Sequence, residues 1–182
     1  LDCAPVSDGA AALVLCPADK AKRFSEHPVR ISGIGHACDT IALSSRRDIC
    51  TMDAVVRAVK KGYHMARITP KDIDVVETHD TTTFTEIMTI EDLLLVEKGA
   101  AGKMALDGAT AIDGKIPVNP SGGLKSRGMP LGAIGVAQVV ELVRQLRGKA
   151  EGRQVPNART GMALNIGGTG GTACVTILEA MS

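Results

Sequence analysis

The spacing of apolar residues along the chain predicts strands that alternate with amphipathic helices. Six segments have the short apolar runs, or the alternation of apolar and polar residues, that are typical of strands, at residues 10–15, 28–34, 73–77, 116–118, 161–166 and 172–178. The glycine-rich segment 167–171 joins the last two strands. Because a short glycine-rich connection is typical of a hairpin, we expect these two strands to pair antiparallel.

Three segments have the apolar spacing of amphipathic helices, at residues 52–63, 83–98 and 130–148. Thr51 is the expected N-cap of the first, Gly99 the expected stop of the second, and Pro130 the expected start of the third. The segment 100–115 shows no period and is expected to be irregular. Strands and helices in this order indicate an α/β fold, a layered α/β domain with a mixed sheet.

Composition narrows the class of protein without identifying a function. With 182 residues, of which 45% are hydrophobic and 23% charged, the chain is long enough for one globular domain with a sizeable core. Its 21 basic and 20 acidic residues give no basic field for nucleic acid, and the few aromatic residues leave little to stack on bases. We therefore expect no nucleic-acid partner.

The cysteines and the hydropathy indicate the compartment. Five cysteines without a C-x-x-C pair argue against a disulfide framework and against a thiolate zinc site, so we expect no metal and a reducing, cytoplasmic location. No apolar run approaches the ~20 residues that a membrane-spanning helix needs. The chain begins at Leu1 without methionine, inside what the pattern indicates is a loop, and we expect it to be a piece of a longer protein.

Three loops are candidates for chemistry. The loop 79–83 lies between a predicted strand and a predicted helix, where free N–H groups can hold an anion, although Asp and Thr are ordinary N-caps and a lone histidine is more often structural. In the loop 122–130, Lys125 or Arg127 can meet a phosphate, although such cations are usually solvated. The G-x-G of 167–171 precedes a strand rather than a helix, which excludes a dinucleotide or P-loop site.

Five motifs follow one another along the chain, at residues 7–12 (SDGAAA), 76–80 (VETHD), 118–124 (VNPSGGL), 128–133 (GMPLGA) and 165–170 (NIGGTG). Together they resemble the C-terminal part of the sterol-carrier-type thiolases, the acetyl-CoA acetyltransferase-like proteins, and their archaeal and bacterial relatives. The resemblance runs over nearly the whole chain. It implies a thiolase-like fold of two similar α/β halves, in which residues 1–25 end the N-terminal half and residues 26–182 are the C-terminal thiolase domain.

The resemblance also implies a site for an acyl-CoA thioester. Its implied catalytic residues are His79, which contributes to an oxyanion hole, and Thr81, which stands where many relatives have a proton-transferring cysteine. The implied substrate-binding residues shape the site for the pantetheine-bound thioester and are Asn119, Gly122, Gly123, Met129, Asn165, Gly167, Gly168 and Gly170. Coenzyme A enters as part of the substrate, and no bound cofactor or metal is implied.

Four positions depart from the family pattern. Thr81 and Thr82 stand where relatives have Cys or Ala followed by Phe, Met129 replaces the histidine of Gly-His-Pro, and Leu164 stands where many relatives have histidine. A threonine hydroxyl cannot replace a thiol in proton transfer near neutral pH, and a methionine cannot do the work of an imidazole. In the family the nucleophilic cysteine belongs to the N-terminal half, which this chain does not contain.

Two hypotheses remain open on these residues. The first is a thiolase-like acyl-CoA protein that forms or cleaves a carbon–carbon bond, by an acyltransferase (Claisen) or a retro-aldol reaction, and that is incomplete without an N-terminal half. Retro-aldol cleavage needs a base and enolate stabilisation but no cysteine nucleophile. The alternative is a non-catalytic acyl-CoA-binding or scaffolding subunit with a thiolase fold. In both cases the resemblance implies a homo-oligomer, with a zinc-ribbon/OB-fold accessory protein as a further partner.

Overall fold

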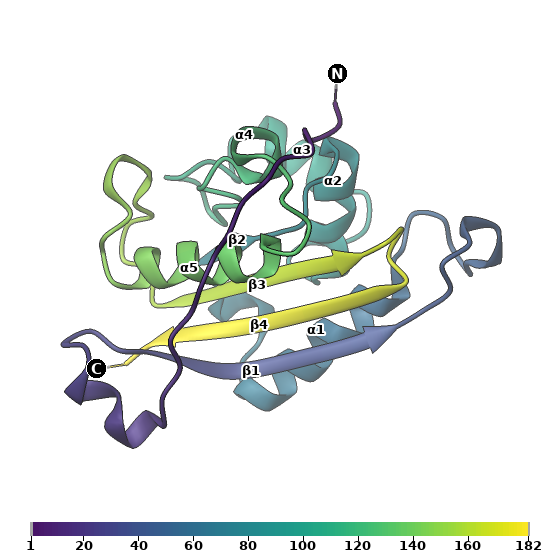
Figure 1. Ribbon diagram of the computed structural model, residues 1–182. Coiled ribbons are helices and arrows are strands. Elements are labelled where there is room, and N and C mark those ends of the chain that lie inside the picture. Colours follow the sequence, from purple (N-terminus) through teal and green to yellow (C-terminus); the bar gives the residue numbers. More distant parts are fainter. Residues whose placement is uncertain (1, 182) are drawn as a thin grey trace.

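A mixed four-stranded sheet forms the centre of the molecule. The computed structural model describes residues 2–181, and its strands lie in the order β1-β4-β3-β2 (Figure 1). Their bounds are β1 Val29–Cys38, β2 Val75–Glu77, β3 Thr160–Gly167 and β4 Thr172–Ala180. β2 runs parallel to β3, β3 and β4 form the predicted antiparallel hairpin, and β1 pairs antiparallel with β4. The structure confirms a layered α/β domain with a mixed sheet.

Helices cover both faces of the sheet (Figure 1). The α-helices of the described residues are α1 Asp53–Ala66, α2 Thr83–Asp92, α3 Ala101–Leu106, α4 Gly123–Arg127 and α5 Ile134–Leu146. Short 3-10 helices lie at η1 Ala18–Arg23, η2 Leu43–Ser45, η3 Pro70–Asp72 and η4 Glu151–Arg153. Across residues 2–181, no helix is both long enough and apolar enough to cross a membrane.

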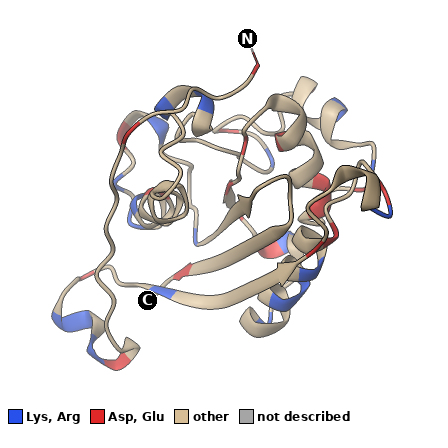
Figure 2. Ribbon diagram, turned by 45° about the vertical axis from the view of Figure 1, so that its right-hand side comes forward, with Lys and Arg blue, Asp and Glu red and all other residues tan. Residues whose placement is uncertain are grey.

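The alternation of side chains along β3 divides the core between two layers. Met162 and Leu164 join the apolar cluster that contains Val55 of α1. Ala163, which lies between them in sequence, packs on the other side with Leu142 of α5. Charged residues of both signs are dispersed mostly outside these layers (Figure 2). The sheet therefore has one face toward α1 and the other toward α5.

Glycines allow α1 to lie close to β1. A Cβ atom built on Gly35 would lie 1.8 Å from the carbonyl oxygen of Ala58, and one on Gly33 would lie 2.4 Å from the carbonyl oxygen of Gly62. Since these neighbours are backbone atoms of a helix, they cannot move aside as the end of a side chain can. Both positions therefore need glycine.

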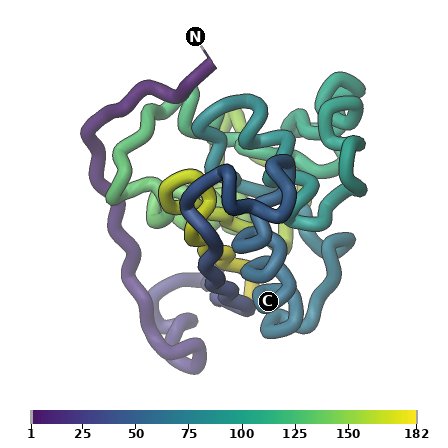
Figure 3. The backbone as a smooth tube through the Cα atoms, turned by 90° about the vertical axis from the view of Figure 1, so that its right-hand side faces the viewer, coloured from purple at the N-terminus to yellow at the C-terminus, as the bar shows by residue number. Residues whose placement is uncertain are grey.

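The N-terminal residues run in extended form along one side of the molecule (Figure 3). The amide of Ala4 donates a hydrogen bond to the carbonyl oxygen of Thr81 at 2.9 Å, and the amide of Met129 donates to the carbonyl oxygen of Pro5 at 2.8 Å. The N-terminal segment thus connects the loop that follows β2 with the loop that precedes α5.

The segment 10–15, predicted to be a strand, is not one. It pairs with no strand in the described part of the chain, and Val14 and Leu15 are 98% and 72% exposed. A strand needs a neighbour whose backbone groups complete its hydrogen bonds, and an apolar run alone does not supply one. The expectation that residues 1–25 end an N-terminal half stays a prediction.

The second predicted helix ends before Gly99. α2 ends at Asp92, and Glu91 Oε1 accepts hydrogen bonds from the amides of Gly99 at 2.9 Å and Ala101 at 3.2 Å. The chain therefore folds back, and α3 begins inside the segment 100–115, which was predicted to be irregular. Helical spacing does not reveal this turn, because the carboxylate that caps α3 belongs to the preceding helix.

The remaining differences lie at the ends of elements. The N-cap residue of α1 is Met52 rather than Thr51, because the carbonyl oxygen of Met52 accepts the first helical hydrogen bond, from the amide of Val56 at 3.2 Å. α5 begins only after a turn that starts at Pro130. The segment 116–118 contributes one isolated bridge to β2 in place of a strand.

Replacing Gly35 by alanine should lower the free energy of unfolding by about 3 kcal/mol or more, because the added methyl group meets the backbone of Ala58. Gly102→Ala is the matched control. Nothing lies within 4 Å of a Cβ atom at Gly102 in α3, and alanine favours the helix, so stability should rise by about 0.5 to 1 kcal/mol. Urea denaturation measures both changes, and equal stability of the two variants would contradict the close packing of α1 on β1.

Candidate functional site

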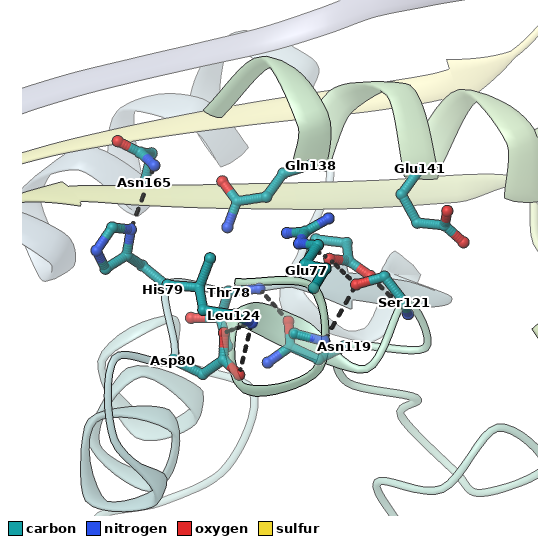
Figure 4. Close-up of polar contacts among 12 residues, drawn as sticks. Glu77, Thr78, His79, Asp80, Asn119, Ser121, Leu124, Gln138, Glu141 and Asn165 are labelled. Atoms are coloured by element: carbon teal, nitrogen blue, oxygen red, sulfur yellow. Dashed lines mark hydrogen bonds and ion pairs between the residues drawn. The ribbon is translucent and has the colours of Figure 1, made fainter. Parts of the chain in front are cut away.

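Residues 77–80, at the end of β2, are bound to residues 119–124 by hydrogen bonds (Figure 4). We call this contact the 77–80/119–124 junction. The carboxylate of Glu77 accepts hydrogen bonds from the Ser121 amide at 3.1 Å and the Ser121 hydroxyl at 2.7 Å, and lies 3.3 Å from the guanidinium of Arg127. Burial raises the pKa of Glu77 to about 7, against the opposing effects of Arg127 and Ser121.

Two further residues of the same segment complete the junction. The Thr78 amide donates to Asn119 Oδ1 at 2.8 Å. The Asp80 carboxylate accepts the Leu124 amide, at 2.9 Å and 3.1 Å from its two oxygens. Hydrogen bonds thus join Glu77, Thr78 and Asp80 to the segment 119–124. His79 does not take part in this contact.

Asn119 and the two glycines that follow it, which the motifs assign to substrate binding, form the turn of the junction. Gly122 and Gly123 have φ angles of 86° and 63°, and Asn119 has a φ of 49°. A Cβ atom on Gly123 would lie 2.0 Å from Asp80 Oδ2. The conformation at Gly122 and Gly123 is therefore one that glycine adopts at little cost. Contact of these three residues with a substrate stays a prediction.

His79 points away from the junction toward β3 (Figure 4). Its Nδ1 lies 3.2 Å from Asn165 Nδ2. Since an amide nitrogen only donates, Nδ1 is the acceptor, and the neutral imidazole carries its proton on Nε2. The side chain is 8% exposed, and burial lowers the pKa of His79 to about 4, so the ring is neutral at pH 7.

A pocket of about 110 Å³ adjoins the imidazole. Its lining residues are Arg46, Met52, His79, Thr81, Thr85, Met88, Ile166, Gly168 and Thr169. The polar groups among them are one guanidinium, one imidazole and three threonine hydroxyls, and within residues 2–181 no carboxylate lines the pocket. Such a lining offers hydrogen-bond donors to a ligand that carries oxygen atoms.

The structure brings together four of the site residues predicted from the motifs, His79, Thr81, Asn165 and Gly168. Thr85 and Arg46 also line the pocket and were not predicted from the sequence. The sequence spacing could have indicated Thr85, because it lies four residues after Thr81 at the start of a helix. The hydroxyls of the two residues are 3.3 Å apart. No sequence pattern indicates Arg46, because it lies in an irregular segment far in sequence from His79 and Thr81.

The turn between β3 and β4 forms one wall of the pocket. Gly168 and Gly170 have φ angles of 60° and 106°, and Gly167 precedes them at the end of β3. A Cβ atom on Gly170 would lie 2.7 Å from Arg46 Nη2 and 2.9 Å from Met52 Sδ. The glycine at position 170 therefore lets this turn approach the guanidinium.

Met129 and Leu164, which depart from the family pattern, lie in apolar surroundings. Met129 packs against the cluster that contains Leu124 and Ile134. Leu164 is fully buried in the core on the α1 side of the sheet. Leu164 is therefore a core residue. The polar residue next to it, Asn165, is the one that contacts the imidazole.

Neither metal ligands nor thiols gather at the pocket in the described part of the chain. Over residues 2–181, no group of three or more His, Cys, Asp or Glu side chains is placed to hold a metal ion. The five cysteines are free and exposed, and none of them lines the pocket.

Comparison with known proteins identifies the class. Residues 35–180 match the family described as thiolase C-terminal domain-like, and the chain belongs to this family. Its fold is that of a solved structure, the Ltp2-ChsH2(DUF35) aldolase, with a TM-score of 0.81 at 22% sequence identity. The match covers 90% of this chain and 42% of that chain. The fold is therefore thiolase-like.

Curated relatives are longer than this chain. The acetyl-CoA acetyltransferase of Methanothermobacter thermautotrophicus is 56% identical over 98% of this chain and 47% of its own length. The acetyl-CoA acetyltransferase of Methanocaldococcus jannaschii is 47% identical, with the same coverage. Sterol carrier protein 2 of Oryctolagus cuniculus is 39% identical over 98% of this chain and 34% of its own length. The chain thus spans about half the length of the first two relatives.

Buried, neutral His79 should make stability depend on pH. A histidine in the unfolded chain titrates near pH 6.5 and His79 in the folded protein near pH 4. Between these values the unfolded state binds more protons, and stability is lost as the pH falls. Relative to His79→Asn, the unmodified protein should lose about 2 to 3 kcal/mol of unfolding free energy between pH 7 and pH 4.5.

Chemical denaturation of both proteins at the two pH values measures this loss. Glu77 titrates in the same range with the opposite sign, because its raised pKa lowers stability as the pH rises through about 4.5 to 7. The difference between the two proteins cancels that contribution. If the unfolding free energies of the unmodified protein and of His79→Asn differ by the same amount at both pH values, His79 is not a buried, neutral imidazole.

Glu77→Ala should lower the free energy of unfolding by about 3 to 5 kcal/mol, because it leaves the guanidinium of Arg127 without its buried carboxylate and opens the junction. Glu179→Ala removes the more exposed pair with Arg30 and should cost less than about 1 kcal/mol. Similar losses in the two variants, measured by urea denaturation, would show that the junction is not a major source of stability.

Proposed function

We propose that this chain is the second α/β half of a longer thiolase-like protein that binds acyl-CoA thioesters and forms or cleaves a carbon–carbon bond. Membership of the thiolase C-terminal domain-like family supports this proposal, as do the relatives named acetyl-CoA acetyltransferase. Because the chain spans about half of those relatives, the activity belongs to the longer protein.

The observation that carries the proposal is the neutral imidazole of His79 at the pocket. Carbon–carbon bond formation or cleavage next to a thioester places negative charge on the thioester oxygen in the transition state. A neutral imidazole with its proton on Nε2 can donate a hydrogen bond to that oxygen, and Asn165 holds the ring in the required tautomer. Because His79 is buried, little reorganisation accompanies the reaction.

The other predicted residues have supporting roles in this proposal. The Thr81 hydroxyl, which lines the pocket, offers a further hydrogen bond to the substrate. The glycines of the β3–β4 turn shape the wall against which the thioester lies. Asn119, Gly122 and Gly123 hold the junction beneath His79. Met129 occupies the loop beside the N-terminal segment and contributes shape rather than proton transfer.

Groups that transfer protons or form a covalent acyl intermediate have to come from elsewhere in the longer protein. His79 has a pKa of about 4 and is a weak base, and a threonine hydroxyl does not act as an acid or base near neutral pH. Two reaction types fit these groups. One is Claisen-type acyl transfer with a cysteine from the preceding half, and the other is retro-aldol cleavage, which needs no cysteine.

A non-catalytic acyl-CoA-binding subunit is the second candidate. The apolar surroundings of Met129 favour this alternative. In the family pattern this position is a histidine, which can act as an acid or a base, whereas methionine cannot. In this alternative the pocket binds an acyl-CoA but does not turn it over.

His79→Ala in the full-length protein should lower kcat by about 100- to 1,000-fold, the effect of one lost oxyanion donor, with little change in acyl-CoA affinity. His64→Ala on the exposed side of α1 is the control and should change neither. Turnover of acetyl-CoA with release of free coenzyme A, together with calorimetric binding, measures both quantities.

The outcomes separate the candidates. Parallel loss of turnover and binding in His79→Ala, or no loss at all, would refute the oxyanion role. Acyl-CoA binding by the unmodified protein without turnover of acetyl-CoA or of a 3-hydroxyacyl-CoA would favour the binding subunit. We also propose a homo-oligomer with a zinc-ribbon/OB-fold accessory protein, on the family resemblance alone, and the mass of the purified complex tests this.

A further inference from the structure

Arg46 places a buried, unpartnered nitrogen at the pocket. Its Nη2 is buried and has no hydrogen-bond partner among residues 2–181. A guanidinium does not lose its proton in proteins, and a charged donor left unsatisfied in the interior costs stability. A ligand with a hydrogen-bond acceptor would therefore satisfy Arg46 Nη2, which finds no acceptor among residues 2–181.

Two neighbouring arginines pair with carboxylates, whereas Arg46 pairs with none among residues 2–181. The adjacent Arg47 donates to both carboxylate oxygens of Asp53, at 3.1 Å and 2.8 Å, and Arg57 lies 3.6 Å from Asp39. Arg46 instead lines the pocket. Its neighbour Arg47 thus provides a matched control in the same segment.

The segment that carries Arg46 is held against the β3–β4 turn. The segment 39–50 lies beside the β3–β4 turn (Figure 3), and the amide of Asp39 donates to the carbonyl oxygen of Gly171 at 2.8 Å. Gly170 allows the guanidinium to approach the turn, where any larger residue would meet it. The half-buried Arg46 therefore lies in the wall of the pocket, with its Nη2 buried.

The lining of the pocket suits one short, anionic ligand group. Arg46 is the one permanently charged side chain that lines it within residues 2–181, since the imidazole of His79 is neutral at pH 7. Hydroxyls of Thr81 and Thr85 add hydrogen-bond donors, and Met52 and Met88 add apolar surface. A volume of about 110 Å³ is smaller than the ~150 Å³ cavity that accommodates benzene. The space fits a few methylene groups and a carboxylate.

We propose that Arg46 is a specificity-determining residue that receives a free carboxylate at the far end of a short acyl group. This inference rests on the proposed function and names its substrate class: the coenzyme A monothioester of a short dicarboxylic acid. The planar guanidinium matches a carboxylate through two parallel hydrogen bonds. The phosphates of coenzyme A are the other anions of such a substrate, but the pantetheine arm separates them from the acyl end, and the nucleotide is far larger than the pocket.

The test compares two non-reactive ligands on the full-length protein. Thioether analogues of succinyl-CoA and butyryl-CoA have acyl chains of equal carbon number and differ in that one ends in a carboxylate and the other in a methyl group. Calorimetry should give the unmodified protein at least about tenfold tighter binding of the succinyl analogue, the scale of one charge-assisted hydrogen bond. Arg46→Gln should reduce this preference to less than about twofold without weakening the butyryl analogue, whereas Arg47→Gln should leave it intact.

The same variants distinguish a ligand-binding role from a structural one. Because Arg46 Nη2 has no partner in the described chain, Arg46→Gln should leave the thermal midpoint of the ligand-free protein unchanged or raise it. A fall of about 4 °C or more, with the ligand preference retained, would show that Arg46 pairs with another part of the longer protein, and would overturn the proposal. Arg46→Lys keeps the charge without the planar fork and should show an intermediate preference, so the test does not depend on one variant.

Failure of this inference is distinguishable from failure of the proposed function. If the unmodified protein binds both analogues equally, Arg46 does not select a carboxylate, while acyl-CoA binding stands. If neither analogue binds, the proposed acyl-CoA site fails and the inference fails with it.

Discussion

The 77–80/119–124 junction is the contact on which the site depends. Its centre is the carboxylate of Glu77, fully removed from water, and such a group is tolerated only where donors surround it. Ser121 donates two hydrogen bonds to it, and the guanidinium of Arg127 lies 3.3 Å away as its ion-pair partner. Since Thr78 and Asp80 bind the same neighbouring segment, the loop after β2 is fixed on one side. The imidazole of His79 is consequently presented on the other side, toward β3.

Burial shifts the pKa values of Glu77 and His79, which both belong to this segment, in opposite directions. It raises the pKa of Glu77 to about 7 and lowers that of His79 to about 4. The histidine therefore stays neutral and can donate from Nε2 while Asn165 occupies Nδ1. Neighbouring Arg46 supplies the positive charge that His79 does not. The pocket thus combines neutral donors with one fixed cation, a combination suited to an oxygen-bearing substrate.

Elements whose cause is local were predictable from the sequence. The apolar stripe of α1 and the glycine-rich β3–β4 connection gave a helix and a hairpin close to the observed ones. The strand expected at 10–15 failed, because strand pairing needs a partner that an apolar run does not specify. The prediction for the end of α2 was wrong for a related reason, since the carboxylate of Glu91 accepts hydrogen bonds from amides beyond the helix.

Site residues that lie within a sequence motif were predictable, whereas a residue that reaches the pocket only through the packing of a distant segment was not. His79 and Thr81 lie in one motif, Gly168 lies in another, and the structure brings them to one pocket. The period of two along β3 places Leu164 in the core, on the face opposite Asn165. Arg46 has no periodic or motif signal and reaches the pocket only because the segment 39–50 packs on the β3–β4 turn.

The described residues supply electrostatic groups, and the proposed chemistry places a substrate oxygen against them. The most direct measurement is a crystal structure of the full-length protein with a bound, non-hydrolysable acyl-CoA analogue that retains the carbonyl group. We expect the carbonyl oxygen to lie about 2.7 to 3.1 Å from His79 Nε2, the distance of an oxyanion donor. A carbonyl group bound outside this pocket, with His79 still bonded only to Asn165, would contradict the proposed role of the imidazole.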